Sequence, residues 1–156
     1  MNISLWMIGK TNSNEFKVWE NDFLKRINGF INFNIEVIDN IKNIKEPEVL
    51  KLEEGKKVLV KIRKDDLLIL LDDNGKSYSS SLFAMYMEKL LSQGGSKRII
   101  FLIGGAFGFH DNIYERSNAK ISLSAMTFSH QLIRIIFMEQ LYRAFTIINH
   151  HPYHNQ

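Results

Sequence analysis

Three glycines directly after an apolar run are the residues whose spacing first suggests chemistry. Gly104, Gly105 and Gly108 follow the run IIFLI at residues 99–103. Their GGxxG spacing matches neither the GxGxxG fingerprint of dinucleotide-binding folds nor the GxxxxGKS/T loop that binds triphosphates. No lysine follows Gly108, so this turn lacks the cation that would hold a triphosphate. A ligand bound here is therefore expected to be something other than a phosphate.

Two further loops rich in small residues also follow apolar runs. The stretch LLDDNGKSYSS covers residues 70–80, and LSAMTFSH covers residues 123–130. Small residues let a backbone approach a ligand closely, and open parallel sheets bind ligands beyond the carboxyl ends of their strands. A glycine after a strand is more often only a turn, so each loop alone is a weak signal. Together, the three loops predict one pocket.

Histidines and carboxylates elsewhere do not form a convincing metal or acid–base site. His150, His151 and His154 lie near the chain end with no carboxylate beside them, so no metal is expected there. Asp72 and Asp73 are adjacent at a strand end, where successive side chains point apart. They are not expected to act as an acid–base pair, and Asp72 is expected to position its loop.

Apolar runs recur at intervals too long for hairpins, at residues 3–8, 33–38, 67–71, 99–103 and 121–124. Segments with helical periodicity lie between and after them, at residues 13–28, 46–63, 80–92 and 129–149. Trp19 is assigned to the core-facing side of the first helix, and Val49 to that of the second. Strands alternating with helices indicate a mostly parallel sheet covered on both faces. We expect one α/β domain over residues 1–156, with the sheet flanked by helices.

Composition limits the class of protein. The chain has no cysteine, which excludes disulfides, thiolate zinc sites and cysteine nucleophiles. Its apolar runs are too short to span a membrane, and the N-terminus lacks the basic start and apolar core of a signal peptide. We therefore expect a cytoplasmic protein without membrane contact.

The net charge of +3 comes from the C-terminal quarter. Residues 116–156 contain Arg116, Lys120, Arg134 and Arg143 against Glu139 alone. A basic, acid-poor segment suits an anionic partner such as RNA. The alternative is an ordinary solvated surface, on which small basic excesses are common.

Four stretches taken together resemble one known family. They are LLDDNGK (70–76), LIGGAFGF (102–109), SAMTFSHQLIRI joined to EQLYRAF (124–145), and the terminal HPYH (151–154). They resemble the SPOUT-class methyltransferases that modify a pseudouridine of large-subunit ribosomal RNA. The resemblance covers the whole chain and is densest from Ile99 onward.

This resemblance implies an α/β fold whose C-terminal segment forms a deep trefoil knot. It implies S-adenosylmethionine as the cofactor and a homodimer whose active site lies near the subunit interface. The implied reaction methylates N3 of a pseudouridine in 23S rRNA, in the stem-loop that faces the decoding region of the assembled ribosome. S-adenosylmethionine carries no phosphate, which agrees with the GGxxG turn.

Site residues are carried over from the same resemblance. The cofactor is expected at Leu71, Gly104, Leu123, Ser124, Ala125, Met126, Thr127 and Phe128. His154 and Tyr153 of the tail, with Arg143 of the last helix, are the expected catalytic residues. Phe107, Phe109 and Tyr153 are expected to offer an aromatic face to a splayed-out base, with loop packing as the alternative for Phe109.

The chemistry of the acceptor suggests roles for the tail. The sulfonium methyl is already activated, so the enzyme mainly aligns donor and acceptor. The imide N3 must lose a proton, and His154 is the first candidate for the base because imidazole titrates near neutral pH. Arg143 would stabilise the developing anion or hold a phosphate. Its alternative is an ion pair with Glu139 one turn earlier, and for the tail as a whole the alternative is disorder.

Three rival functions remain open. A non-catalytic ribosome-binding or assembly factor could keep the fold without turnover, although the cofactor loops are intact. An ordinary nucleotide-binding enzyme is disfavoured by the glycine spacing. A related methyltransferase acting on another RNA, such as tRNA, is excluded only by the resemblance.

Overall fold

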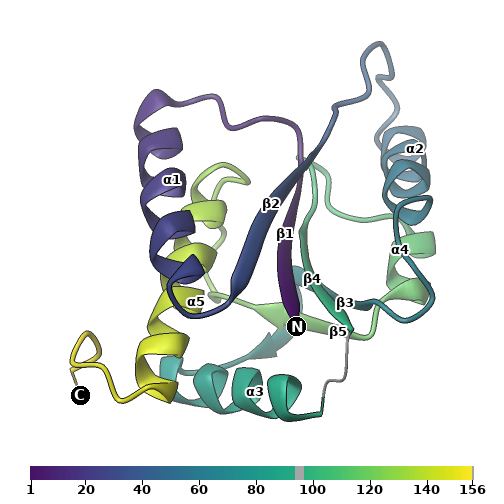
Figure 1. Ribbon diagram of the computed structural model, residues 1–156. Coiled ribbons are helices and arrows are strands. Elements are labelled where there is room, and N and C mark those ends of the chain that lie inside the picture. The colour runs from purple at the N-terminus through teal and green to yellow at the C-terminus, as the bar shows by residue number, and fades with distance from the viewer. Residues whose placement is uncertain (94–96, 156) are drawn as a thin grey trace.

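Strands and helices alternate along the chain in the computed structural model, which describes residues 1–93 and 97–155 (Figure 1). In chain order the elements are β1 (Asn2–Ile8), α1 (Asn14–Asn28), β2 (Asn32–Ile38), α2 (Pro47–Leu59), β3 (Leu67–Ser77), α3 (Ser80–Ser92), β4 (Arg98–Ile103), α4 (Asp111–Arg116), β5 (Ala119–Ser122) and α5 (Leu132–Ile148). The five strands pair in the order β2-β1-β4-β3-β5, and every pair is parallel. The predicted parallel α/β architecture is confirmed.

Helices cover both faces of the sheet, which explains the unbroken apolar runs of the central strands. Ile3, Ile69 and Phe101 face a core shared with α1, α3 and α5. Leu68 and Leu102 face the opposite core, which α2 and α4 cover. Because successive side chains of a strand alternate between faces, a central strand covered on both sides needs apolar residues at every position. Figure 1 shows α1, α3 and α5 on one side of the sheet and α2 and α4 on the other.

Two residues assigned to the core are instead exposed. Trp19 is 51% exposed and contacts Phe16 at a ring-centroid distance of 6.0 Å. The inward stripe of α1 instead passes through Glu20 and Ile27. Val49 is also 45% exposed. Each lies at the margin of its helix face, where periodicity alone does not show how far the neighbouring elements extend.

Strand β3 continues to Ser77, beyond the apolar run at residues 67–71 from which it was predicted. Both Leu71 and Lys76 pair with Ile121 of β5, so the residues between them form an irregularity in the ladder. A Cβ at Gly75 would lie 2.5 Å from the backbone nitrogen of Ile121. Glycine at this position therefore lets the two backbones pass closely.

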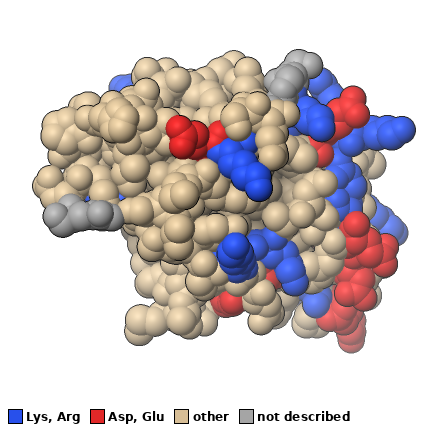
Figure 2. All heavy atoms as spheres, turned by 90° about the horizontal axis from the view of Figure 1, so that it is seen from below, with Lys and Arg blue, Asp and Glu red and all other residues tan. Residues whose placement is uncertain are grey.

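The basic excess of the C-terminal quarter does not form a basic surface. Arg134 is fully buried and donates hydrogen bonds to the carbonyl of Ile8 (2.9 Å), the hydroxyl of Thr11 (3.1 Å) and the carbonyl of His130 (3.1 Å). Arg116 donates to the carbonyls of residues 63 and 66. On the face shown in Figure 2, Lys and Arg side chains are interspersed with Asp and Glu toward one side, and the other side is largely uncharged. Charge counted along the sequence did not predict charge on the surface.

The buried carboxylate of Asp66 makes stability depend on pH. Arg98 donates to Asp66 through Nη2 (2.5 Å) and Nε (3.2 Å), and the backbone N–H of Arg63 donates as well (2.7 Å). Burial disfavours the ionised carboxylate, but these donors outweigh burial and hold the pKa of Asp66 below its ordinary value.

Because this pKa is lowered in the folded state, the stabilisation is present above the ordinary aspartate pKa and lost as pH falls through the folded value. We expect Asp66→Asn to lower the thermal midpoint at pH 7, and the gap from wild type to close below about pH 4. Thermal unfolding followed by circular dichroism from pH 3 to pH 8 measures this gap. Asp65→Asn, a neighbouring substitution, is the control. A gap that stays constant across the range would contradict the assignment.

Candidate functional site

The three small-residue loops meet at the carboxyl edge of the sheet. They line a pocket of about 690 Å³ together with Lys51 from α2. Leu71 comes from β3, Gly104 from the end of β4, and Thr127 and Phe128 from the segment between β5 and α5. The structure therefore brings together residues predicted from three separate stretches of sequence.

Glycines shape the wall of this pocket that follows β4. A Cβ at Gly104 would lie 3.1 Å from the ring of Phe109 and 3.3 Å from the backbone of Gly108. Gly108 has a φ of 79° and donates its N–H to the carbonyl of Gly105 (3.2 Å). The close packing therefore favours glycine at position 104, and the left-handed backbone favours glycine at position 108.

A tyrosine–aspartate contact fixes the loop after Leu71. The hydroxyl of Tyr114 donates to one carboxylate oxygen of Asp72. The other oxygen accepts the backbone N–H of Asn74 (2.8 Å). Burial and the Asp72 contact raise the pKa of Tyr114, so its hydroxyl remains a donor. As expected, Asp72 positions this loop.

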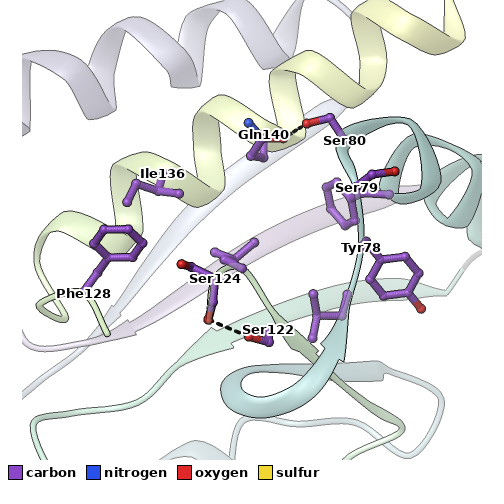
Figure 3. Close-up of a pocket in the computed structure, with 11 residues that line it drawn as sticks. Tyr78, Ser79, Ser80, Ser122, Ser124, Phe128, Ile136 and Gln140 are labelled. Atoms are coloured by element: carbon purple, nitrogen blue, oxygen red, sulfur yellow. Dashed lines mark hydrogen bonds between the residues drawn. The ribbon is translucent and has the colours of Figure 1, made fainter. Parts of the chain in front are cut away.

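The remaining cofactor candidates lie in the segment between β5 and α5, some beside a second pocket and others outside both pockets. Leu123 and Ser124 line a pocket of about 390 Å³, bounded by the start of α3 and the middle of α5 (Figure 3). Phe128 lines both pockets and so joins them. Ala125 and Met126 line neither pocket, and Met126 is 75% exposed.

The aromatic candidates divide between exposure and packing. Phe107 lines the larger pocket and is 53% exposed. Phe109 packs edge-on against Tyr114, at a centroid distance of 5.9 Å. Loop packing, the alternative for Phe109, is therefore present, but Phe109 also lines the larger pocket, so both rings border the space where a ligand would lie.

The tail packs against α5 as a cluster of polar contacts. Arg143 contacts Oε1 of Glu139 through Nη2 (2.6 Å) and Nε (3.1 Å), so the ion pair given as the alternative for Arg143 is present. A further guanidinium nitrogen lies 3.1 Å from Nδ1 of His154. The hydroxyl of Tyr153 donates to the same oxygen of Glu139 (3.2 Å), and Arg143 stacks over the Tyr153 ring at 4.9 Å. We call Glu139, Arg143, Tyr153 and His154 the tail cluster.

The tail cluster is separate from the pocket in a single chain. Ile133, near the start of α5, lines the larger pocket, whereas Arg143 lies ten residues further along the helix. At about 1.5 Å per residue, this separation is roughly 15 Å. No member of the tail cluster lines either hollow. One chain therefore keeps its tail cluster away from the larger pocket. The smaller pocket lies closer to the tail cluster, because Gln140, which lines that pocket, donates to Oε2 of Glu139 (2.7 Å).

Sequence reasoning missed one carboxylate near the pocket. Glu54 of α2 is buried, and no hydrogen-bond partner for it is found within residues 1–93 and 97–155. A Cβ at Gly105 would lie 2.7 Å from its Oε2, so Glu54 supports the back of the glycine turn. Burial raises the pKa of Glu54. The only sequence signal was a glutamate before Gly55 in the helix, which does not indicate burial.

The described residues contain neither a membrane-spanning helix nor a metal-binding cluster. None of the helices within residues 1–93 and 97–155 combines the length and apolar character needed to span a bilayer. Within the same residues, no group of three or more histidines and carboxylates is arranged to hold a metal ion.

Comparison with known proteins places this architecture in a family. Residues 1–154 match the family model described as "Predicted SPOUT methyltransferase". The chain is 46% identical over its full length to a protein from Flavobacterium psychrophilum named "Ribosomal RNA large subunit methyltransferase H", and 45% identical to a protein of the same name from Flavobacterium johnsoniae. Each alignment covers all of both chains.

A solved structure shares the fold at much lower identity. The Legionella pneumophila protein Lpg2936, solved with its bound cofactor SAM, superposes with a TM-score of 0.51 and 12% identity. The match covers 92% of this chain and 66% of that chain, slightly less than two thirds. At this identity the likeness concerns the fold alone. The family model and the full-length relatives show that the chain belongs to the SPOUT methyltransferase family.

Proposed function

We propose that the protein methylates N3 of a pseudouridine in 23S rRNA, with S-adenosylmethionine as the methyl donor. The observation that carries the proposal is the pocket where the loops after β3, β4 and β5 converge. The name shared by the full-length relatives supports a large-subunit rRNA substrate. The bound SAM of the Legionella protein supports this choice of cofactor for the fold.

The pocket suits a ligand without phosphates. Its glycine turn lacks a phosphate-binding lysine in sequence, and Lys51, which lines the pocket from α2, is paired with Glu48 (2.7 Å). Leu71, Thr127 and Phe128 provide apolar contacts for adenine, and backbone groups of the glycine turn are available to read the edge of the ring. When bound, S-adenosylmethionine supplies a methyl group that is already activated. The residues of the chain then need to align the acceptor base with the methyl group and to assist the loss of the N3 proton.

The separation of pocket and tail cluster supports an active site shared between two chains. If each tail reaches the pocket of a second copy, a homodimer contains two complete sites. Exposed apolar residues on α1, including Val18 (64% exposed) and Trp19, lie on the helix that packs beside α5 and offer surface for such a contact. We place this reaction in the cytoplasm, where assembled ribosomes are available.

The C-terminal trefoil knot is part of the same proposal. The start of α5 is bonded to the end of β1 and the loop after it, through Arg134 and Gln131. Gln131 accepts the N–H of Asn12 (3.0 Å) and donates to the carbonyl of Lys10 (3.2 Å). These bonds would hold a threaded segment in place.

The proposal is tested by incubating the protein with methyl-labelled S-adenosylmethionine and ribosomes from a strain that lacks it. We expect one methyl group per ribosome, located by mass spectrometry of 23S rRNA fragments at N3 of a pseudouridine. Transfer to tRNA instead would identify a related methyltransferase with another substrate. Ribosome binding without transfer would identify a non-catalytic assembly factor.

A further inference from the structure

The two ring nitrogens of His154 have different surroundings. Nδ1 lies 3.1 Å from Nη1 of Arg143. A guanidinium can only donate hydrogen bonds, so Nδ1 must be the acceptor and cannot carry a proton. Nε2 is buried and has no hydrogen-bond partner among the described residues.

This pairing fixes the tautomer of the ring. With the Nδ1 lone pair engaged, the proton of the neutral imidazole lies on Nε2. Glu139 holds Arg143 through Nε and Nη2, and this contact fixes the direction in which Nη1 points. Glu139 therefore orients Arg143, which in turn orients His154. A ring held in this state has no free lone pair with which to accept a proton from N3.

Tyr153 does not offer a base either. Its hydroxyl donates to Glu139 (3.2 Å), and burial, reinforced by the Glu139 carboxylate, raises the pKa of Tyr153. The carboxylate of Glu139 is occupied as well, because Oε1 accepts from Arg143 and Tyr153, and Oε2 accepts from the side-chain amide of Gln140 (2.7 Å). The Nε2–H of His154 is therefore the group of the tail cluster that remains available to bond to a substrate.

We propose that His154 acts as a hydrogen-bond donor through Nε2, to a carbonyl oxygen next to N3 of the acceptor base, and not as the general base. This inference rests on the proposed function. In the reaction, the N3 proton passes to solvent water and negative charge spreads onto the flanking carbonyl oxygens. The N3 electron pair then bonds to the methyl carbon while the carbon–sulfur bond breaks, its electrons remaining on sulfur. A donor aimed at one of those oxygens stabilises the anion as it forms.

The burial of Nε2 adds a requirement. The residues that cover this atom must shift when RNA binds, while the bond between Arg143 and His154 is retained. The tail after residue 150 contains no helix or strand among its described residues, so such a shift leaves the sheet and α5 unchanged.

Substitution of His154 by different amides separates a donor from a base. The side-chain nitrogen of glutamine can occupy the position of Nε2 and donate a hydrogen bond, but an amide cannot act as a base at neutral pH. Asparagine reaches only to the position of Nδ1. We expect His154→Gln to retain methylation of ribosomes within about 10-fold of wild type, whereas His154→Asn and His154→Ala lose about 100-fold or more. Calorimetry should give wild-type affinity for S-adenosylmethionine in all three variants.

Two results would overturn the inference. One is a glutamine variant as inactive as the alanine variant. The other is nitrogen NMR of the labelled protein showing the proton of His154 on Nδ1 at neutral pH. If the wild-type protein itself transfers no methyl group to ribosomes, the proposed function fails instead, so the two failures are distinguishable.

Discussion

Replacing Gly104 with arginine is expected to abolish binding of S-adenosylmethionine. The Cβ of any residue at this position would lie 3.1 Å from the ring of Phe109, and the longer side chain must then occupy the pocket or open the glycine turn. Either outcome removes the space between the three loops. Isothermal titration calorimetry should show at least a 100-fold loss of affinity, equivalent to about 2.7 kcal/mol or more.

A matched substitution separates pocket filling from general damage. Gly29→Arg introduces the same side chain at the end of α1, where a Cβ would approach only the carbonyl of Arg26 (3.1 Å). We expect this control to bind S-adenosylmethionine with wild-type affinity. Thermal unfolding should show that Gly104→Arg remains folded at the assay temperature. Near wild-type affinity in the folded Gly104→Arg protein would place the cofactor elsewhere.

Replacing Arg143 with alanine is expected to lower turnover by about 100- to 1,000-fold, with cofactor affinity unchanged. The substitution removes the partner of Glu139 and of His154 together and releases the Tyr153 ring. Single-turnover methylation of ribosomes measures the loss, and calorimetry measures cofactor affinity. Arg143→Lys, which keeps the charge without the planar fork, should be intermediate. A parallel loss of cofactor affinity would contradict the separation of tail cluster and pocket.

Mixing these two variants tests whether the active site is shared between chains. If each site combines one chain's pocket with the other chain's tail, a heterodimer of Gly104→Arg and Arg143→Ala contains one intact site and one doubly defective site. Random pairing would then restore about a quarter of wild-type activity, although each variant alone is inactive. No recovery in the purified heterodimer would mean that pocket and tail act within one chain.

Much of this protein could be derived from local sequence pattern. The apolar runs located all five strands of the described chain, and alternation with helices predicted their parallel arrangement. Ser13, a residue type that favours helix N-termini, caps α1, where its hydroxyl accepts the N–H of Phe16 (3.3 Å). These features depend on interactions between residues close together in the chain, so composition and period are sufficient to predict them.

Other features depended on contacts that sequence spacing does not encode. Trp19 is exposed because the neighbouring elements do not extend over it. Arg134 is buried because it donates hydrogen bonds to acceptors more than a hundred residues away in the chain. The pairing of Nδ1 of His154 with Arg143 reversed the chemistry that an isolated imidazole suggests.

By itself, the sequence determined the strands, most helices, the phosphate-free character of the glycine turn, and the loops that would meet if the sheet were parallel. Only the tertiary structure decided that these loops enclose one pocket, that the tail lies apart from it along α5, and that the last basic residues are internal partners. The physical reason is that hydrophobic periodicity is a local property of the chain. Charge pairing, proton position and the distance between two sites are set by side chains that only folding brings together.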